Sequence, residues 1–293
     1  MTDDFTIVGI RPAAAPVAPK KPWYRGRPVA AMLLLALIVL GCVLIPPLLH
    51  RDAAYMDLQN CNVAPGRAFW FGTDTMGRDI FAMIWSGGRM SLSIGFLSTF
   101  ISTVLAIVFG SLSGCAGKTL DAALMRLTEI LLSVPNLLLV VFLQAILGAP
   151  SVLSLSFVIG LTSWTSIAKV VRTEVRILRT SEYVLASRAM GGGFFHILLR
   201  HLTPNFLSSI LFMVVMNVRS AILAESTLSF MGIGLPLEVI SWGSMLSLAE
   251  KALLTGSWWI ILIPGVFLVA TLLCITALGN DLRRNVTRQS SNL

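Results

Sequence analysis

Apolar residues gather along this chain in long uninterrupted runs, and polar and charged residues collect in the gaps between them. Each run is about 20 residues long, and a helix of that length crosses the ~30 Å hydrocarbon core of a bilayer. The alternation of apolar and polar residues typical of membrane β-strands is missing from these runs. The pattern therefore predicts an all-α polytopic membrane protein with about six transmembrane helices, at roughly 29–49, 90–115, 122–147, 151–171, 205–225 and 258–278.

The gaps between the runs divide the chain into regions. Residues 1–28 are rich in Pro and Ala, and we expect a disordered cytoplasmic tail there. Residues 29–89 hold the first transmembrane helix and an outer loop. The apolar run in them is too long for a signal-peptide core, so this helix should be retained. Residues 90–280 form the membrane core with a basic cytoplasmic loop at 172–203, and residues 281–293 form a cytoplasmic tail.

Composition and charge agree with this interpretation. The chain is 56% hydrophobic and only 12% charged, whereas soluble domains carry roughly a quarter charged residues. Its net charge of +8 comes mainly from three clusters, at Lys20–Arg27, Lys169–Arg200 and Arg283–Arg288. The positive-inside rule places all three, and both termini, in the cytoplasm. Since topology and anionic lipid account for the positive charge, we expect the lipid bilayer as a partner and do not expect a nucleic acid.

No residues suggest covalent chemistry of the chain's own. GCAGKT at Gly114–Thr119 looks like a phosphate-binding loop, but that motif needs a glycine where Leu112 stands and a strand before it. His50, His196 and His201 have no Cys, Asp or Glu at metal-ligand spacing. The four cysteines do not suggest a disulfide framework. We therefore predict no catalytic residue, no metal site and no ATPase site in this chain.

Two features inside the predicted spans bear on packing and transport. Gly110 and Gly114 have the small-xxx-small spacing that lets helices approach closely, and packing within this chain is favoured over a subunit contact. Arg219 lies in the fifth span between Asn217 and Glu225. A charge at mid-bilayer costs about 2.5–3.5 kcal/mol, so it should face protein or water. Either Arg219 is structural, or Asn217, Arg219 and Glu225 line a path for polar solute; both interpretations stay open.

The segment Glu182–Asn205, EYVLASRAMGGGFFHILLRHLTPN, separates two strongly apolar runs. Ser181 can cap a first short helix, whose partly apolar face would include Tyr183, Val184, Ala186 and Met190. Glycines 191–193 interrupt the helix, and Phe194–Leu202 predicts a second one before Pro204 starts the next span. Two short helices with exposed aromatics suggest docking into a partner's groove. The alternative is an amphipathic element on the inner leaflet, held by Arg188 and Arg200.

This segment resembles the cytoplasmic loop of ABC importer permeases, whose pattern is EAA, three residues, Gly, nine residues, and I-x-L-P. The spacing from Gly191 to Pro204 fits that pattern. Leu185, Ala186 and Ser187 stand at the EAA positions, and His201 and Thr203 replace the isoleucine and the leucine. With Leu185 in place of Glu, hydrophobic docking is expected there rather than a salt bridge.

Four further blocks resemble one branch of these permeases, the C-type subunits of the dipeptide/oligopeptide/nickel family. They are FGTDTMGRDIF with GGRMSL, RHLTPN, ILAESTLSFMGIG and SWGSML, and they occur in order over most of the chain. The resemblance implies a type I ABC importer permease in the bacterial plasma membrane, with a second homologous permease, two cytoplasmic ATPases and an extracytoplasmic solute-binding protein as partners. ATP and Mg²⁺ would be used by the ATPases, with no cofactor bound here.

The same resemblance implies that the loop docks in an ATPase groove and couples nucleotide-driven closure to alternating access. The residues it assigns to coupling are Glu182, Tyr183, Ala186, Ser187, Arg188, Gly191, Phe194, Phe195, His201 and Pro204. Peptides are the preferred substrate because the sequence around Glu225 looks closer to the peptide-transporting members. Nickel, a metal chelate or an opine is the alternative. A rival of another class is an ion-coupled secondary transporter that uses Glu225 or Glu129 as its carrier.

Overall fold

The computed structural model describes residues 28–49, 52–236, 238–248, 252 and 255–290, and it is helical, with no strand among them. Within these described residues, four helices are long and apolar enough to cross a membrane, or up to six if two bent helix pairs each count as one span. The predicted all-α polytopic class is therefore confirmed. The elements are α1 (Val29–Leu48), α2 (Ile80–Cys115), α3 (Lys118–Ser133), α4 (Asn136–Leu147), α5 (Val152–Ser163), α6 (Thr165–Leu178), α7 (Glu182–Ala189), α8 (Phe194–Ile197), a π-helix (Leu198–Leu202), α9 (Thr203–Phe230), α10 (Trp242–Leu246) and α12 (Trp259–Ser290).

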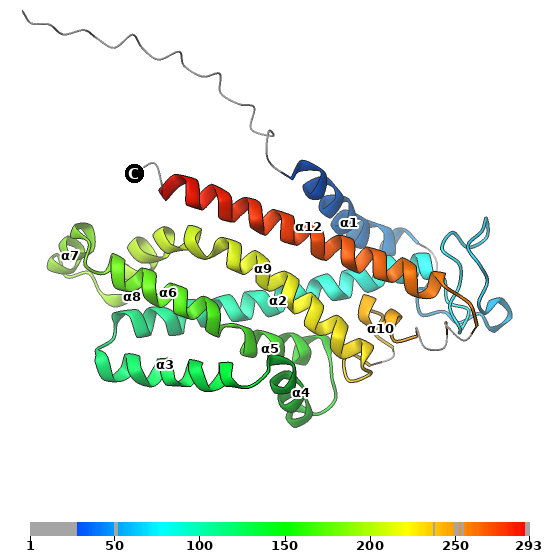
Figure 1. The fold of residues 1–293 in the computed structure, drawn as a ribbon, viewed down its shortest axis with the longest axis horizontal. Helices are drawn as coiled ribbons and strands as arrows, with labels where there is room; N and C mark the ends of the chain where they lie inside the picture. Colours follow the sequence, from blue (N-terminus) through cyan, green and yellow to red (C-terminus); the bar gives the residue numbers. More distant parts are fainter. Residues whose placement is uncertain (1–27, 50–51, 237, 249–251, 253–254, 291–293) are drawn as a thin grey trace, which may run out of the picture.

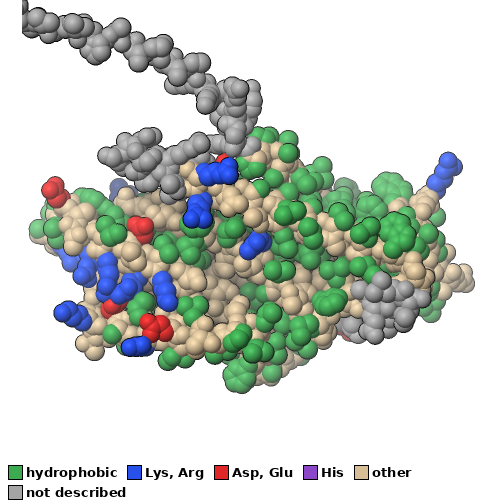
Figure 2. Space-filling view, viewed as in Figure 1, with side chains coloured by type: hydrophobic (Ala, Val, Ile, Leu, Met, Phe, Trp, Pro, Cys, Tyr) green, Lys and Arg blue, Asp and Glu red, His purple; other side chains and the backbone are tan. Residues whose placement is uncertain are grey.

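The long helices run along the longest axis of the molecule, and α4 lies across it, below α5, between the two ends (Figure 1). One end carries α7 and α8, and the opposite end carries the loop at 52–79 together with α10. Helix α2 packs against α1, α5, α6 and α9, so it is the central helix of the bundle. On the face shown in Figure 2, Lys and Arg side chains gather mostly on the half that carries α7 and α8.

The predicted third span at 122–147 is not one continuous helix. Helices α3 and α4 meet at an angle of 96° across Val134 and Pro135. Proline has no N–H to donate, and its ring disfavours helical backbone at the residue before it. Val134 accordingly adopts extended angles (φ −93°, ψ 132°). A second, milder bend of 47° separates α5 from α6 near Trp164.

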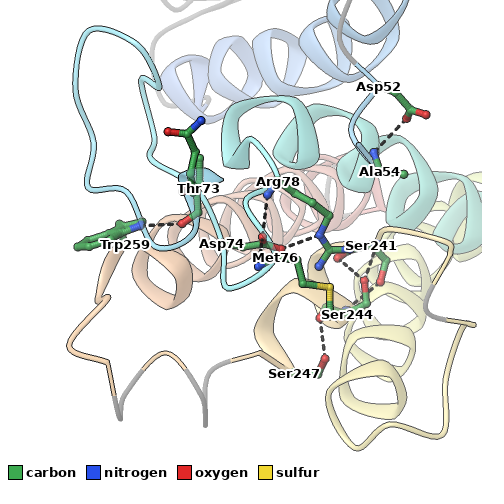
Figure 3. A network of polar contacts seen from close by, with 11 residues as sticks. Asp52, Ala54, Thr73, Asp74, Met76, Arg78, Ser241, Ser244, Ser247 and Trp259 are labelled. Carbon is green, nitrogen blue, oxygen red and sulfur yellow. Dashed lines mark hydrogen bonds and ion pairs between the residues drawn. The ribbon is translucent and has the colours of Figure 1, made fainter. Parts of the chain in front are cut away.

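Helix α2 begins ten residues before the predicted start at 90, because the FGTDTMGRDIF block folds into a turn that caps it. Asp74 accepts hydrogen bonds from the backbone N–H groups of Met76 and Arg78 and from the Arg78 side chain (2.8, 2.9 and 2.6 Å), an arrangement visible in Figure 3. Asp79 then caps α2 by accepting from the Phe81 N–H. Trp259 at the start of α12 donates to the Thr73 carbonyl at 3.1 Å and fastens the turn to the bundle.

The last two spans are also longer than predicted. Helix α9 continues to Phe230, and α12 continues to Ser290, so the predicted C-terminal tail is helical over its first ten residues. The predicted tail at 1–28 lies outside the described residues apart from Pro28.

Gly110 and Gly114 of α2 face α6, which confirms the prediction of packing within this chain. A Cβ atom at Gly110 would lie 2.7 Å from the Ala168 carbonyl oxygen, and one at Gly114 would lie 2.7 Å from Val175 Cγ1. The two backbones therefore approach more closely than any larger residue permits.

Candidate coupling segment and transport pocket

The first helix of the predicted docking segment, α7, forms two turns. Ser181 stands at its N-cap position, but the predicted side-chain cap is not made: the Ser181 hydroxyl donates instead to the Leu178 carbonyl at 2.6 Å. Glu182 in the first turn and Arg188 in the last turn complement the helix dipole.

Gly191 makes the predicted sharp turn after α7. Its φ of +85° is a left-handed conformation that glycine adopts without the steric cost of a Cβ atom. The Gly191 N–H donates to the Arg188 carbonyl, and the Gly192 N–H donates to the Ser187 carbonyl, both at 2.9 Å. This pair of bonds is the Schellman arrangement, which satisfies carbonyls at a helix C-terminus.

The second piece of the segment is not a separate helix, contrary to the prediction. Helix α8 runs into the π-helix Leu198–Leu202, which continues without a loop into α9. Pro204 does lie in the first turn of α9. The Thr203 N–H donates to the Leu198 carbonyl, five residues back, which is the π-helical hydrogen-bond pattern. This change of pattern comes just before Pro204, which has no backbone N–H to donate.

One face of the segment is buried in the membrane domain. Val184, Ile197, Leu198 and Leu202 share one apolar core with residues of α6 and α9. The predicted apolar face of α7 is therefore divided, because Val184 points inward while Tyr183, Ala186 and Met190 are exposed. The segment is thus attached to α6 and α9 on one side and offers apolar side chains on the other.

The remaining predicted coupling residues are distributed over both faces. Ser187 is buried, and Arg188 is exposed. The ring of the half-buried His201 lies between those of Tyr183 and His196, with centroids at 6.0 and 5.7 Å. The side chains of Phe194 and Phe195 lie outside the described part of the chain.

A pocket of about 520 Å³ opens where the two bent helix pairs meet α9. Its walls combine apolar side chains with hydroxyl and amide groups, which suits a polar organic solute better than a bare ion. Asn217 lines it and donates to Ser102 at 2.5 Å. The other polar lining residues are Asn136, Thr162, Ser163, Thr165, Ser166 and Ser220. Sequence reasoning missed these residues, although the polar cluster LTSWTS inside an apolar run is a visible signal.

The other two predicted path residues do not line this pocket. Glu225 is fully buried and accepts hydrogen bonds from Ser91 of α2 (2.9 Å) and from Ser226 and Ser229 of α9 (3.3 and 2.9 Å). Ser91 in turn accepts from the Trp242 N–H of α10, so Glu225 joins three helices. Arg219 is half-buried, and its Nε has no hydrogen-bond partner among the described residues. Of the three predicted path residues, Asn217 alone thus lines this pocket.

Comparisons with known proteins agree with this architecture. The family described as "Binding-protein-dependent transport system inner membrane component" matches residues 106–288. The chain is 32% identical to the dipeptide transport system permease protein DppC of Bacillus subtilis (strain 168), over 87% of this chain and 79% of that protein. It is 34% identical to the oligopeptide transport system permease protein OppC of the same organism, over 87% and 83%. It is 37% identical to a putative peptide permease protein of Brucella suis biovar 1 (strain 1330), over 84% of each.

The similarities agree with the structure, which has a central long helix, two bent helix pairs and a glycine-broken segment attached to α6 and α9. The chain belongs to the family of binding-protein-dependent transport system inner membrane components, as a C-type ABC importer permease and a multi-pass protein of the bacterial inner membrane.

Proposed function

We propose that this chain is one of two permease subunits of an ATP-driven importer that takes up di- or oligopeptides, and that α7 and α8 couple it to a cytoplasmic ATPase. The observation that carries the proposal is the two-sided packing of the segment. Its inner face belongs to the same core as α6 and α9, while Tyr183, Leu185 and Met190 are exposed (42%, 51% and 82%). Exposed apolar groups on a rigidly attached helix are suited to filling a partner's groove.

The pocket between the bends and α9 is, in this proposal, the chain's share of the translocation path. Hydroxyl and amide groups can hydrogen-bond the N–H and C=O groups of a peptide without binding one side chain selectively. Selection among solutes would then rest largely with the extracytoplasmic binding protein. The names of the relatives support peptides as the solute class.

The mechanism we propose is alternating access. ATP binding closes the paired ATPases and draws α7 of this chain toward its counterpart in the second permease. Since α7 is packed on α6 and α9, and both of these helices line the pocket, the displacement reaches the pocket walls. The ligands need to shift the balance between inward- and outward-open states by only a few kcal/mol. The partner ATPases bind ATP and Mg²⁺ and carry out hydrolysis.

The test is uptake into proteoliposomes that contain the complete complex and its binding protein. The proposal expects accumulation of labelled peptide that requires ATP and that unlabelled peptide, but not nickel or a metal chelate, competes away. Competition by the metal species would reassign the substrate. Uptake by this chain alone, driven by a proton or sodium gradient without ATP, would overturn the proposal in favour of a secondary transporter.

A further inference from the structure

A compact ionic cluster joins α2, α3 and α6 at the end of the bundle that carries α7. Asp121 in the first turn of α3 accepts from both the Nε and the Nη2 of Arg172, the latter at 2.7 Å. Arg176, one turn later on α6, also donates to Asp121, and so does the hydroxyl of Ser113 at 2.6 Å. In addition, Arg179 donates to the Gly114 carbonyl of α2 at 3.0 Å.

This cluster is shielded in a way that an ordinary surface ion pair is not. The Asp121 side chain is 9% exposed and that of Arg172 is 22% exposed. Two-point contact between a guanidinium and a carboxylate fixes both distance and orientation, and it is stronger than a single hydrogen bond. Asp121 also lies in the first turn of α3 and Arg176 in the last turn of α6, so each of these two charges is favoured by its own helix dipole.

The ionic cluster connects two helices that both reach the pocket. Helix α6 starts at the pocket with Thr165 and ends three residues before α7. Helix α3 starts at the cluster and ends at Ser133, just before Val134 and Pro135, which also line the pocket. The cluster thus joins α6, which leads to α7, to α3, which leads to Val134 and Pro135 in the pocket lining.

We propose that Asp121 is a positioning residue for transport, which holds α3 to α6 so that a displacement of α7 moves both pocket walls as one body. The proposal rests on the function proposed above. Without the ionic cluster, α6 would move without α3. The ATPases would still hydrolyse ATP, but the pocket would not open fully to the other side of the membrane.

The experiment compares Asp121→Asn with wild type in the complete complex, measuring peptide uptake and ATP hydrolysis together. We expect the peptide taken up per ATP hydrolysed to fall about tenfold or more, with substrate-stimulated hydrolysis retained and with Asp121→Glu restoring much of the uptake. The matched control is Glu129→Gln on the same helix, which removes an exposed ion pair with Arg126 and should leave the ratio unchanged. Wild-type complex without ATP-driven uptake would instead refute the proposed function.

A second readout separates positioning from simple stabilisation. Spin labels at the exposed positions Leu127 of α3 and Ile177 of α6 report the distance between the two helices. In wild type we expect the same narrow distance distribution in nucleotide-free and ATP-trapped complexes, and in Asp121→Asn a distribution that changes with nucleotide. An unchanged distribution, or an unchanged ratio of uptake to hydrolysis, would overturn the proposal. If Asp121→Asn does not assemble, Arg176→Gln removes the more exposed arm, and the same two measurements decide.

Discussion

Single residues decide where the helices of this chain stop and turn. The break at Gly191 was predictable, because three consecutive glycines interrupt a helical pattern and the φ of +85° needs glycine. The break at Pro135 was equally visible in the sequence, but the long apolar run around it suggested one continuous span. The partner of Glu225 on α2 was not predictable, because Ser91 is 134 residues away and becomes a neighbour only after the helices pack.

The turn at Gly191 provides a test at this scale. Gly191→Val places a β-branched residue in left-handed backbone, which costs about 1–2 kcal/mol, and should displace α8 from α7. We expect lower substrate-stimulated ATP hydrolysis and uptake by the assembled complex. Gly193→Ala is the control, because Gly193 lacks a positive φ and has open space around its Cβ position. Equal activity of the two variants would contradict the assignment.

Glu225 provides a second test. Glu225→Ala leaves buried serine hydroxyls without an acceptor and should destabilise the protein by about 2 kcal/mol or more, which lowers the melting temperature by about 4–8 °C. Glu225→Gln keeps one carbonyl oxygen as an acceptor, so it should melt closer to wild type and still support ATP-driven uptake. Loss of uptake in a stably folded Glu225→Gln variant would instead favour a carrier role for this carboxylate.

At the scale of elements, hydrophobic periodicity predicted the spans but not how they bend or how far they extend. Apolar side chains are compatible both with lipid and with a packed protein interior, so an apolar run does not show which of the two surrounds it. The predicted span for α2 began too late because Ile80–Arg89 contains polar residues and glycines. In the structure, most of that stretch is buried by α10 and α1. The inward face of the segment Glu182–Asn205 was missed for the same reason, because its burial depends on how the segment packs against α6 and α9.

The exposed face of α7 gives the test for this scale. The double variant Leu185→Asp/Met190→Asp adds two charges to the apolar docking face without touching the buried Val184. We expect the variant to fold and insert normally but to lose the ATPases on purification, because charges cannot enter an apolar groove without a partner. Leu58→Asp, at the opposite end of the molecule and 77% exposed, is the control and should retain them. Full retention by the double variant would show that docking uses another surface.

At the scale of the whole molecule, the distribution of Lys and Arg (Figure 2) agrees with the positive-inside prediction that the end with α7 and α8 faces the cytoplasm. Single cysteines at Met190 and Leu58, 82% and 77% exposed, test this orientation. In a background without the native cysteines, a membrane-impermeant maleimide should label the Leu58 position in intact spheroplasts and the Met190 position only after the membrane is opened. The reverse pattern would invert the topology and remove α7 from reach of any cytoplasmic ATPase.

In the proposed function, this chain works as the membrane subunit of an assembly whose energy comes from separate ATPases. Mass spectrometry of the intact complex, purified through this chain from its native membrane in mild detergent, tests it most directly. We expect a second permease of the same family and two P-loop ATPase subunits bound to the chain. Recovery of the chain alone, or of copies of itself without any ATPase, would contradict it.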